Sequence, residues 1–295
     1  MSLASLSGFN WERIGSNAYL AKSIIDWASL ITLFLITSLV GLGRWGFRQP
    51  FRLDDPNIQY PFTEHERVPG LLLFFYSMLV PLTGVILLSL AHTRKLARLN
   101  SAALGLLLTL AATGMITNVI KVWVGRPRPD LLARCHPRKL DPITDGLYHS
   151  GFVDDSICTT PLNSYLLEDG FRSFPSGHSS SSFAGLVYLA LCVRAALSSV
   201  VHQISRAYVY SAAPTDLVDE EHNEQDPDFR RPPPNEPLIP VAFSVLLPLV
   251  PVMVAAYVAI SRVMDHRHHP TDVLAGASLG TVMAFAVYRA THLRD

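Results

Sequence analysis

Six long apolar segments, free of charge over most of their length, constrain what this chain of 295 residues can fold into. Only 16% of the residues are charged, against about 25% in soluble globular proteins. About 20 apolar residues cross the hydrocarbon core of a bilayer as a helix. We therefore predict an all-α fold, a six-span transmembrane helical bundle, with spans at residues 27–43, 68–91, 99–120, 175–193, 238–260 and 270–288.

One integral membrane domain over residues 1–295 accounts for these spans, with one interruption. Residues 200–236 become acidic and end in Pro232-Pro233-Pro234, a composition typical of a flexible polar insert. The formal net charge is zero, so bulk electrostatics gives no reason to expect a nucleic-acid partner.

Three cysteines are too few for a disulfide framework. Cys135 and Cys158 fall in one polar loop and could pair if that loop faces an oxidising compartment, or could remain free thiols; both alternatives stay open. Cys192 lies in an apolar run, where packing is the expected role.

Alternation of six spans places four span ends on one face of the membrane: the end of the third, the start of the fourth, the end of the fifth and the start of the sixth. Unusual polar residues occur at these ends, namely Lys121 with Arg128, Ser176-Gly177-His178, Arg262, and His268 with Asp272. The short basic loop with Arg94, Lys95 and Arg98 favours a cytosolic position for the opposite face. The polar cluster is then expected on the lumenal or extracytoplasmic face; the sequence assigns neither an organelle nor an oligomeric state.

The stretch 261–272 carries two arginines, three histidines and two aspartates between two apolar spans. Ionisable residues in such a position are costly and indicate a functional site. Lys121, Arg128 and Arg262 together suit a phosphate, whose oxygens match the arginine fork. Residues 175–178 (Pro-Ser-Gly-His) open a span, and a helix N-terminus offers free N–H groups and a positive dipole end to an anion.

Two histidines at these span ends, His178 and His268, suit phosphoryl transfer. Transfer from an ester to water needs a nucleophile and an acid for the leaving oxygen, roles that His268 and His178 could fill. Asp272 lies one helical turn beyond His268 and could hold one imidazole nitrogen, leaving the other free to attack.

Simpler interpretations exist for each feature. Lys121 and Arg262 could be interfacial anchors, and the serines at 179–182 could serve helix packing. A metal site is the alternative for one further group of side chains: Asp265, His266, His268, His269 and Asp272.

Three motifs in order give the chain a family resemblance. Lys-x6-Arg-Pro occurs at 121–129, Pro-Ser-Gly-His at 175–178, and Ser-Arg-x5-His-x3-Asp at 261–272. The chain in this respect resembles the type 2 phosphatidic acid phosphatases (PAP2), the lipid phosphate phosphatases related to vanadium haloperoxidases. The spacing selects Arg128 rather than Arg126, and His268 from three neighbouring histidines. Residues 54–62 look like the fungal diacylglycerol pyrophosphate phosphatase branch.

The resemblance implies a role for each motif residue. His268 would be the nucleophile that forms a phosphohistidine, Asp272 would orient it, and His178 would protonate the leaving alcohol and then activate water. The expected phosphate ligands are Lys121, Arg128, Ser176, Gly177 and Arg262.

The expected substrates are membrane phospholipid phosphates: phosphatidate, lysophosphatidate or diacylglycerol pyrophosphate. The resemblance implies no metal and no cofactor. Two alternatives are a vanadate-dependent haloperoxidase, which uses the same pocket, and a non-catalytic protein that binds or transports lipid phosphates.

Overall fold

The computed structural model describes residues 11–42, 46–90, 95–139, 151–211 and 241–292. Within these ranges, six helical rods are long and apolar enough to cross a membrane, which confirms the predicted fold class. They are α1 (Trp11–Leu42), the continuous rod α2–η2–α3 (Gly70–Phe74, Phe75–Leu79, Val80–Leu90), α4 (Lys95–Val124), α7 (Gly177–Ser211), α8 (Val241–Met264) and α9 (Pro270–His292).

The fourth span is longer than the sequence pattern predicted. Helix α7 continues from Gly177 to Ser211, so residues 200–211, which we assigned to the polar insert, are helical. Arg194 does not end the helix, since a long basic side chain near a membrane boundary can extend its charge toward water while its stem stays among apolar groups. Residues 212–236 of the expected insert lie outside the described residues.

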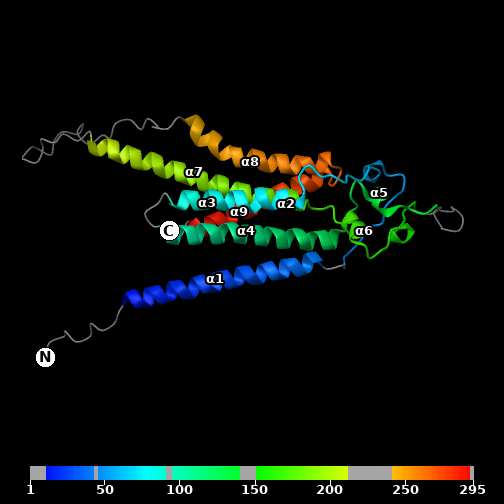
Figure 1. Cartoon of the computed structure of the whole chain (residues 1–295), viewed down its shortest axis with the longest axis horizontal. Helices are drawn as coiled ribbons and strands as arrows, with labels where there is room; N and C mark the ends of the chain where they lie inside the picture. The colour runs from blue at the N-terminus through cyan, green and yellow to red at the C-terminus, as the bar shows by residue number, and fades with distance from the viewer. Residues whose placement is uncertain (1–10, 43–45, 91–94, 140–150, 212–240, 293–295) are drawn as a thin grey trace, which may run out of the picture.

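Helix α7 is the centre of the bundle. It packs against α3, α4, α8 and α9, and all of these rods run side by side in Figure 1. Its contact with α9 is close: a Cβ built on Gly276 would lie 2.5 Å from the carbonyl oxygen of Ser176, and one on Gly280 would lie 2.3 Å from that of Ser180. Small residues four apart allow helix backbones to approach in this way.

Large apolar side chains cover the outside of the rods, as a bilayer requires. Exposed examples come from several helices: Leu39, Leu71, Leu87, Met253 and Val282. A soluble monomer rarely presents so much contiguous apolar surface to water.

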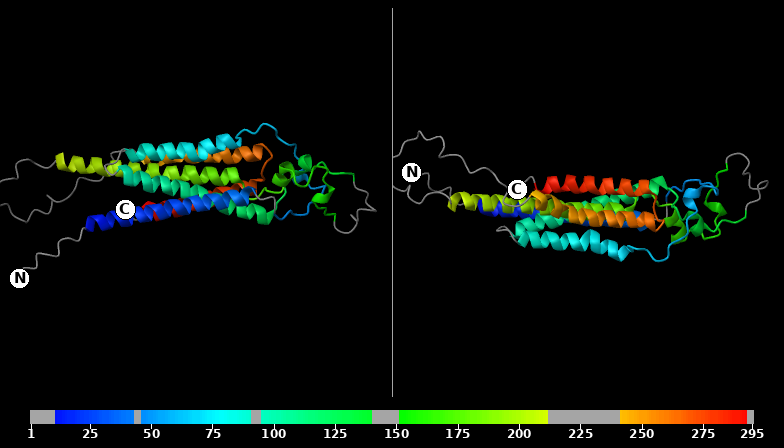
Figure 2. Two further views of the ribbon diagram at one scale, coloured as in Figure 1. Left: turned by 60° about the horizontal axis from the view of Figure 1, so that its bottom comes forward. Right: turned by 90° about the horizontal axis from the view of Figure 1, so that it is seen from above.

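A small globular cap covers one end of the bundle (Figures 1 and 2). We use "the cap" for residues 46–69, 125–139 and 151–176, which include η1 (Pro56–Ile58), α5 (Leu131–Cys135), η3 (Asp155–Ile157) and α6 (Tyr165–Gly170). Its apolar centre contains Phe51, Ile58, Leu131, Cys135, Val153, Ile157, Leu167 and Phe171. The described residues form two isolated β-bridges here, Phe51 with Val153 and Pro137 with Cys158.

Cys135 and Cys158 both lie in the cap and form a disulfide. They are 23 residues apart in the sequence, and their Cα atoms are 4.7 Å apart. Of the two alternatives left open by the sequence, the structure has the paired one. Cys192 is a free thiol on α7.

Candidate active site

The three motifs meet where the bundle joins the cap, as the alternation of spans predicted. Lys121 lies in the last turn of α4, where its Nζ donates to the carbonyl oxygen of Arg172 at 2.6 Å. The chain then turns at Gly125, which has a φ of +60°. A Cβ on this residue would lie 1.9 Å from the carbonyl oxygen of Phe47, so only glycine fits the turn that leads to Arg128.

Arg128 is buried, and three contacts fix its guanidinium. Its Nε donates to the carbonyl oxygen of Asp169 at 2.7 Å, and its Nη2 donates to the Asp169 carboxylate, also at 2.7 Å. Its Nη1 donates to the carbonyl oxygen of Arg267 at 3.1 Å. Arg267 directly precedes His268, so the first motif holds the backbone of the third.

Ser176 precedes the first residue of α7 and is fully buried. Its Oγ accepts from the backbone N–H of Ser179 at 3.4 Å, an N-cap contact, and its own N–H donates to the carbonyl oxygen of Asp272 at 3.0 Å. A Cβ on Gly177 would lie 3.8 Å from Cε of Lys121. The N-terminus of α7 therefore lies beside the lysine of the first motif and the aspartate of the third.

His178 and Arg262 converge on one backbone carbonyl, that of Val68 just before α2. His178 Nε2 and Arg262 Nη1 both lie 3.1 Å from this oxygen. Because a carbonyl only accepts, each nitrogen donates to it. Arg262 Nη1 also pairs with the Glu66 carboxylate at 3.0 Å, whereas its buried Nε has no hydrogen-bond partner among the described residues.

His268 is 3% exposed, and its Nδ1 lies 2.7 Å from the carbonyl oxygen of Ser173. Since the carbonyl accepts, Nδ1 carries the proton and Nε2 keeps a free lone pair. Burial, together with the positive charge of Arg128, lowers the pKa of His268 well below its ordinary value of 6.5. A neutral imidazole with a free Nε2 is the form that a histidine nucleophile needs.

The Asp272 carboxylate lies near this imidazole, but the hydrogen bonds that it accepts come from other groups. Its carboxylate is 3.8 Å from Nδ1 of His268, longer than a hydrogen bond, so the partner of Nδ1 is Ser173 rather than the aspartate we expected. The carboxylate accepts from Arg126 Nη1 at 2.6 Å, Ser173 Oγ at 2.5 Å and the backbone N–H of His269 at 3.0 Å. Asp272 thereby connects the segments that carry all three motifs.

Sequence reasoning missed several residues that organise this site. Arg126 was set aside in favour of Arg128, yet it forms the ion pair with Asp272. Ser173 contacts both His268 and Asp272, and it lies two residues before the Pro-Ser-Gly-His motif, which begins at residue 175. Glu66 bridges Arg262 and Arg267 through oxygens at 3.0 and 2.9 Å. Their positions in the sequence could have indicated a role, because all three residues are charged or polar and lie close to a motif or to a span end.

The neighbouring histidines have separate environments. His266 stacks on Tyr60 with ring centroids 4.5 Å apart, and His269 contacts Asp272 and the carbonyl oxygen of Asn57. In the part of the chain that the structure describes, no three His, Cys, Asp or Glu side chains are grouped as metal ligands.

Comparison with known proteins supports the same assignment. Residues 102–295 match the PAP2 superfamily. The chain is 32% identical to a probable diacylglycerol pyrophosphate phosphatase of Schizosaccharomyces pombe, over 94% of this chain and 85% of the relative. It is 35% identical to diacylglycerol pyrophosphate phosphatase 1 of Saccharomyces cerevisiae, over 82% and 71%, and 30% identical to lipid phosphate phosphatase 1 of Arabidopsis thaliana, over 90% and 66%. No solved structure matches the chain.

These matches confirm the family and the phosphatase class that the three motifs indicated. The family match covers more than half of the chain, includes every motif and begins within α4. Together with the six membrane-spanning rods and the polar site beneath the cap, these matches show that the chain is an integral membrane protein of the PAP2 superfamily, whose named relatives are phosphatases of lipid phosphates.

Proposed function

We propose that this protein is a metal-independent lipid phosphate phosphatase that hydrolyses phosphatidate, diacylglycerol pyrophosphate or lysophosphatidate through a phosphohistidine on His268. The observation that carries the proposal is the hydrogen bond between His268 Nδ1 and the Ser173 carbonyl, because it leaves Nε2 unprotonated in a site where Arg128 of the first motif binds the backbone directly before His268. The names of the relatives support the choice of substrates.

In the first step, Nε2 of His268 attacks phosphorus and the bond from phosphorus to the leaving oxygen breaks. His178 acts as an imidazolium, the form that the negative charge of a bound phosphate favours. It gives its Nε2 proton to that oxygen and becomes a neutral imidazole, and the oxygen leaves as an alcohol or, from a pyrophosphate, as a phosphate monoester. Arg128, Arg262, Lys121 and the N-terminus of α7, with Ser176 and Gly177, stabilise the charge on the transferring group. Asp272 holds the loop that carries the nucleophile through His269 and Ser173.

In the second step, His178 takes a proton from water, and the resulting hydroxide attacks phosphorus. The bond from phosphorus to Nε2 breaks, which releases inorganic phosphate and restores neutral His268. Three cations and a helix end supply the charge stabilisation that a metal gives in other phosphatases, so we expect no metal requirement.

We place the site on the lumenal or extracytoplasmic face of the membrane. The cap adjoins the site and contains the Cys135–Cys158 disulfide. Disulfides persist in oxidising compartments and are rare in the cytosol, which supports this orientation. The lipid would remain in that leaflet while its head group reaches the residues under the cap.

The decisive experiment measures phosphate release by detergent-purified protein from phosphatidate and from diacylglycerol pyrophosphate, with EDTA present. Wild type should release phosphate, and His268→Ala should release none while remaining folded. His65→Ala is the matched control, since His65 is exposed on the cap, and should behave as wild type. Brief reaction with substrate radiolabelled in its phosphoryl group should leave an acid-labile label on wild type and on His65→Ala, and none on His268→Ala.

Each alternative has its own outcome. Release that stops with EDTA and returns with a divalent ion would indicate a metal enzyme. Retained turnover in folded His268→Ala would exclude His268 as the nucleophile. Binding of phosphatidate without release would favour a lipid-phosphate binding or transport protein, and oxidation of bromide with vanadate and peroxide would favour a haloperoxidase.

A further inference from the structure

We propose that Asp169 is a positioning residue for Arg128, and that Arg134, anchored beside the cap disulfide, holds Asp169 in place. The inference rests on the proposed role of Arg128 as a phosphate ligand. It extends the site beyond its three motifs to two residues of the cap, and it makes the geometry of phosphate binding depend on the cap's own ion pairs.

Asp169 accepts two hydrogen bonds from one edge of the Arg128 guanidinium. Its backbone carbonyl accepts from Nε and its Oδ1 accepts from Nη2, each at 2.7 Å. Together with the contact from Nη1 to Arg267, these bonds take three of the five N–H donors that an arginine has. One N–H on each terminal nitrogen remains, so the guanidinium has a fixed orientation and still two donors for a phosphate.

Arg134 holds the other oxygen of the same carboxylate. Its Nη1 donates to Oδ2 of Asp169 at 3.0 Å and to the carbonyl oxygen of Leu166 at 3.1 Å. Its Nε and Nη2 form a two-point contact with Asp130, at 2.8 and 3.0 Å. Arg134 is 1% exposed and Asp130 is fully buried, so this pair is a rigid support rather than a surface ion pair.

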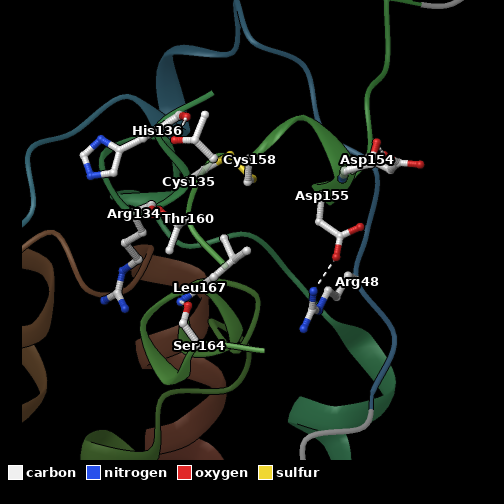
Figure 3. The surroundings of a disulfide bond; sticks show 12 residues. Arg48, Arg134, Cys135, His136, Asp154, Asp155, Cys158, Thr160, Ser164 and Leu167 are labelled. Atoms are coloured by element: carbon white, nitrogen blue, oxygen red, sulfur yellow. Dashed lines mark hydrogen bonds and ion pairs between the residues drawn. A yellow bond between two sulfur atoms is a disulfide. The ribbon is translucent and has the colours of Figure 1, made fainter. Parts of the chain in front are cut away.

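The disulfide fixes the backbone from which Arg134 extends. Cys135 is the next residue and is joined to Cys158, and Oγ1 of Thr160 donates to the carbonyl oxygen of Arg134 at 2.6 Å. Figure 3 shows the Arg134 side chain extending away from the two sulfur atoms. The disulfide of the neighbouring Cys135 thus restrains the backbone of Arg134, and Asp130 restrains its side chain.

The charges agree with this arrangement. Burial alone would raise the pKa of Asp169, but the positive charges of Arg128 and Arg134 outweigh it and hold the pKa below the ordinary value. Asp169 is therefore an anion at neutral pH that two arginines share. Such sharing orients Arg128 without neutralising it, so the guanidinium still attracts a phosphate.

The test is calorimetric titration of purified protein with orthovanadate, an analogue of the phosphoryl group, because binding can be measured in variants that do not turn over. Asp169→Asn preserves the shape of the side chain and removes its charge. We expect it to weaken vanadate binding about tenfold, since it loses charge-assisted contacts with an arginine. In an Arg128→Ala background the same change should alter binding by less than about twofold, since coupled residues are not additive.

Asp155→Asn is the matched control. Asp155 pairs with Arg48 in the same cap (Figure 3), its side chain is 25% exposed against 20% for Asp169, and neither partner contacts Arg128. It should bind vanadate as wild type does. If Asp169→Asn does not fold, Arg134→Lys takes its place, because it keeps the positive charge but loses the fork that spans Asp130 and Asp169; we expect it also to weaken binding severalfold.

The outcomes separate this inference from the proposed function. If Arg128→Ala binds vanadate as wild type does, Arg128 is not a phosphate ligand and both proposals fail at that residue. If Arg128→Ala weakens binding but Asp169→Asn does not, the positioning role is wrong and the phosphate site stands. Equal losses from Asp169→Asn in the presence and absence of Arg128 would show that Asp169 acts by another route and would overturn the inference.

Discussion

Nδ1 of His268 lies 2.7 Å from the carbonyl oxygen of Ser173, 95 residues earlier in the chain, while the Asp272 carboxylate one turn ahead is 3.8 Å away. A backbone carbonyl can only accept a hydrogen bond, so this contact fixes the tautomer of the imidazole with its proton on Nδ1. The nucleophile that we propose is thus prepared by main-chain geometry, and Asp272 acts on the surrounding loop.

The first prediction concerns pH. His268 stays neutral in the folded protein because burial and Arg128 lower its pKa well below 6.5, whereas in the unfolded chain it protonates near 6.5. Its contribution to stability is therefore complete above about pH 6.5 and declines as the pH falls toward the folded pKa, by at most about 1.4 kcal/mol per unit. Thermal unfolding in detergent between pH 7.5 and 5 should show a smaller decline for His268→Asn than for wild type; identical slopes would contradict the neutral, buried state.

The second prediction concerns the contact between α7 and α9. A methyl group at Gly276 would lie 2.5 Å from the carbonyl oxygen of Ser176, so Gly276→Ala must push α9 away from the N-terminus of α7. Displacement of about 1 Å at a catalytic site can lower the rate about 100-fold. We expect kcat/KM to fall about 10- to 100-fold.

Gly70→Ala is the control for that variant, because a Cβ on Gly70 meets nothing within 4 Å. It should retain activity. Equal activities of the two variants would show that the close approach of α9 is not needed to form the site.

The third prediction concerns Glu66, whose carboxylate bridges Arg262 and Arg267. Both arginines are buried: Arg262 is 2% exposed and Arg267 is 7% exposed. Glu66→Gln leaves these two buried cations with more distant anions, Asp265 and Asp130, each 3.8 Å away. Loss of one partner of a buried ion pair is strongly destabilising, and partial exposure of Glu66 reduces the effect to about 2 kcal/mol.

Thermal unfolding measures this loss, with Glu64→Gln as the control at an exposed neighbouring position. If Glu66→Gln and Glu64→Gln unfold at the same temperature, Glu66 does not stabilise the arginine pair.

The fourth prediction concerns the disulfide, which joins two cap residues that are 23 positions apart in the sequence. By the loop-entropy model, a link across a segment of this length contributes about 3 kcal/mol. Changing both Cys135 and Cys158 to serine should lower the unfolding temperature, and a reducing agent should lower that of wild type to a similar extent. The same agent should leave the double variant unchanged; an effect there would mean that reduction acts elsewhere.

The sequence alone predicted the features that depend on neighbouring residues. Runs of apolar residues identified six spans, because helix formation in a bilayer needs only local backbone hydrogen bonds and apolar side chains. Alternation of those spans then required that the residues around Lys121, Ser176, Arg262 and His268 share one end of the bundle, and the structure brings them together there. The extension of α7 to Ser211 was missed because one arginine was taken as the end of a span.

The tertiary structure decided which groups meet within that end. Ser173 on Nδ1 of His268, Arg126 on Asp272, Glu66 on Arg262 and Asp169 on Arg128 are pairs separated by 41 to 196 residues, and the pairing of Cys135 with Cys158 was open. Periodicity and spacing report the environment of a residue relative to its own helix. The choice among several nearby carboxylates, carbonyls and arginines depends on how helices and cap pack against one another, and only the folded chain specifies that packing.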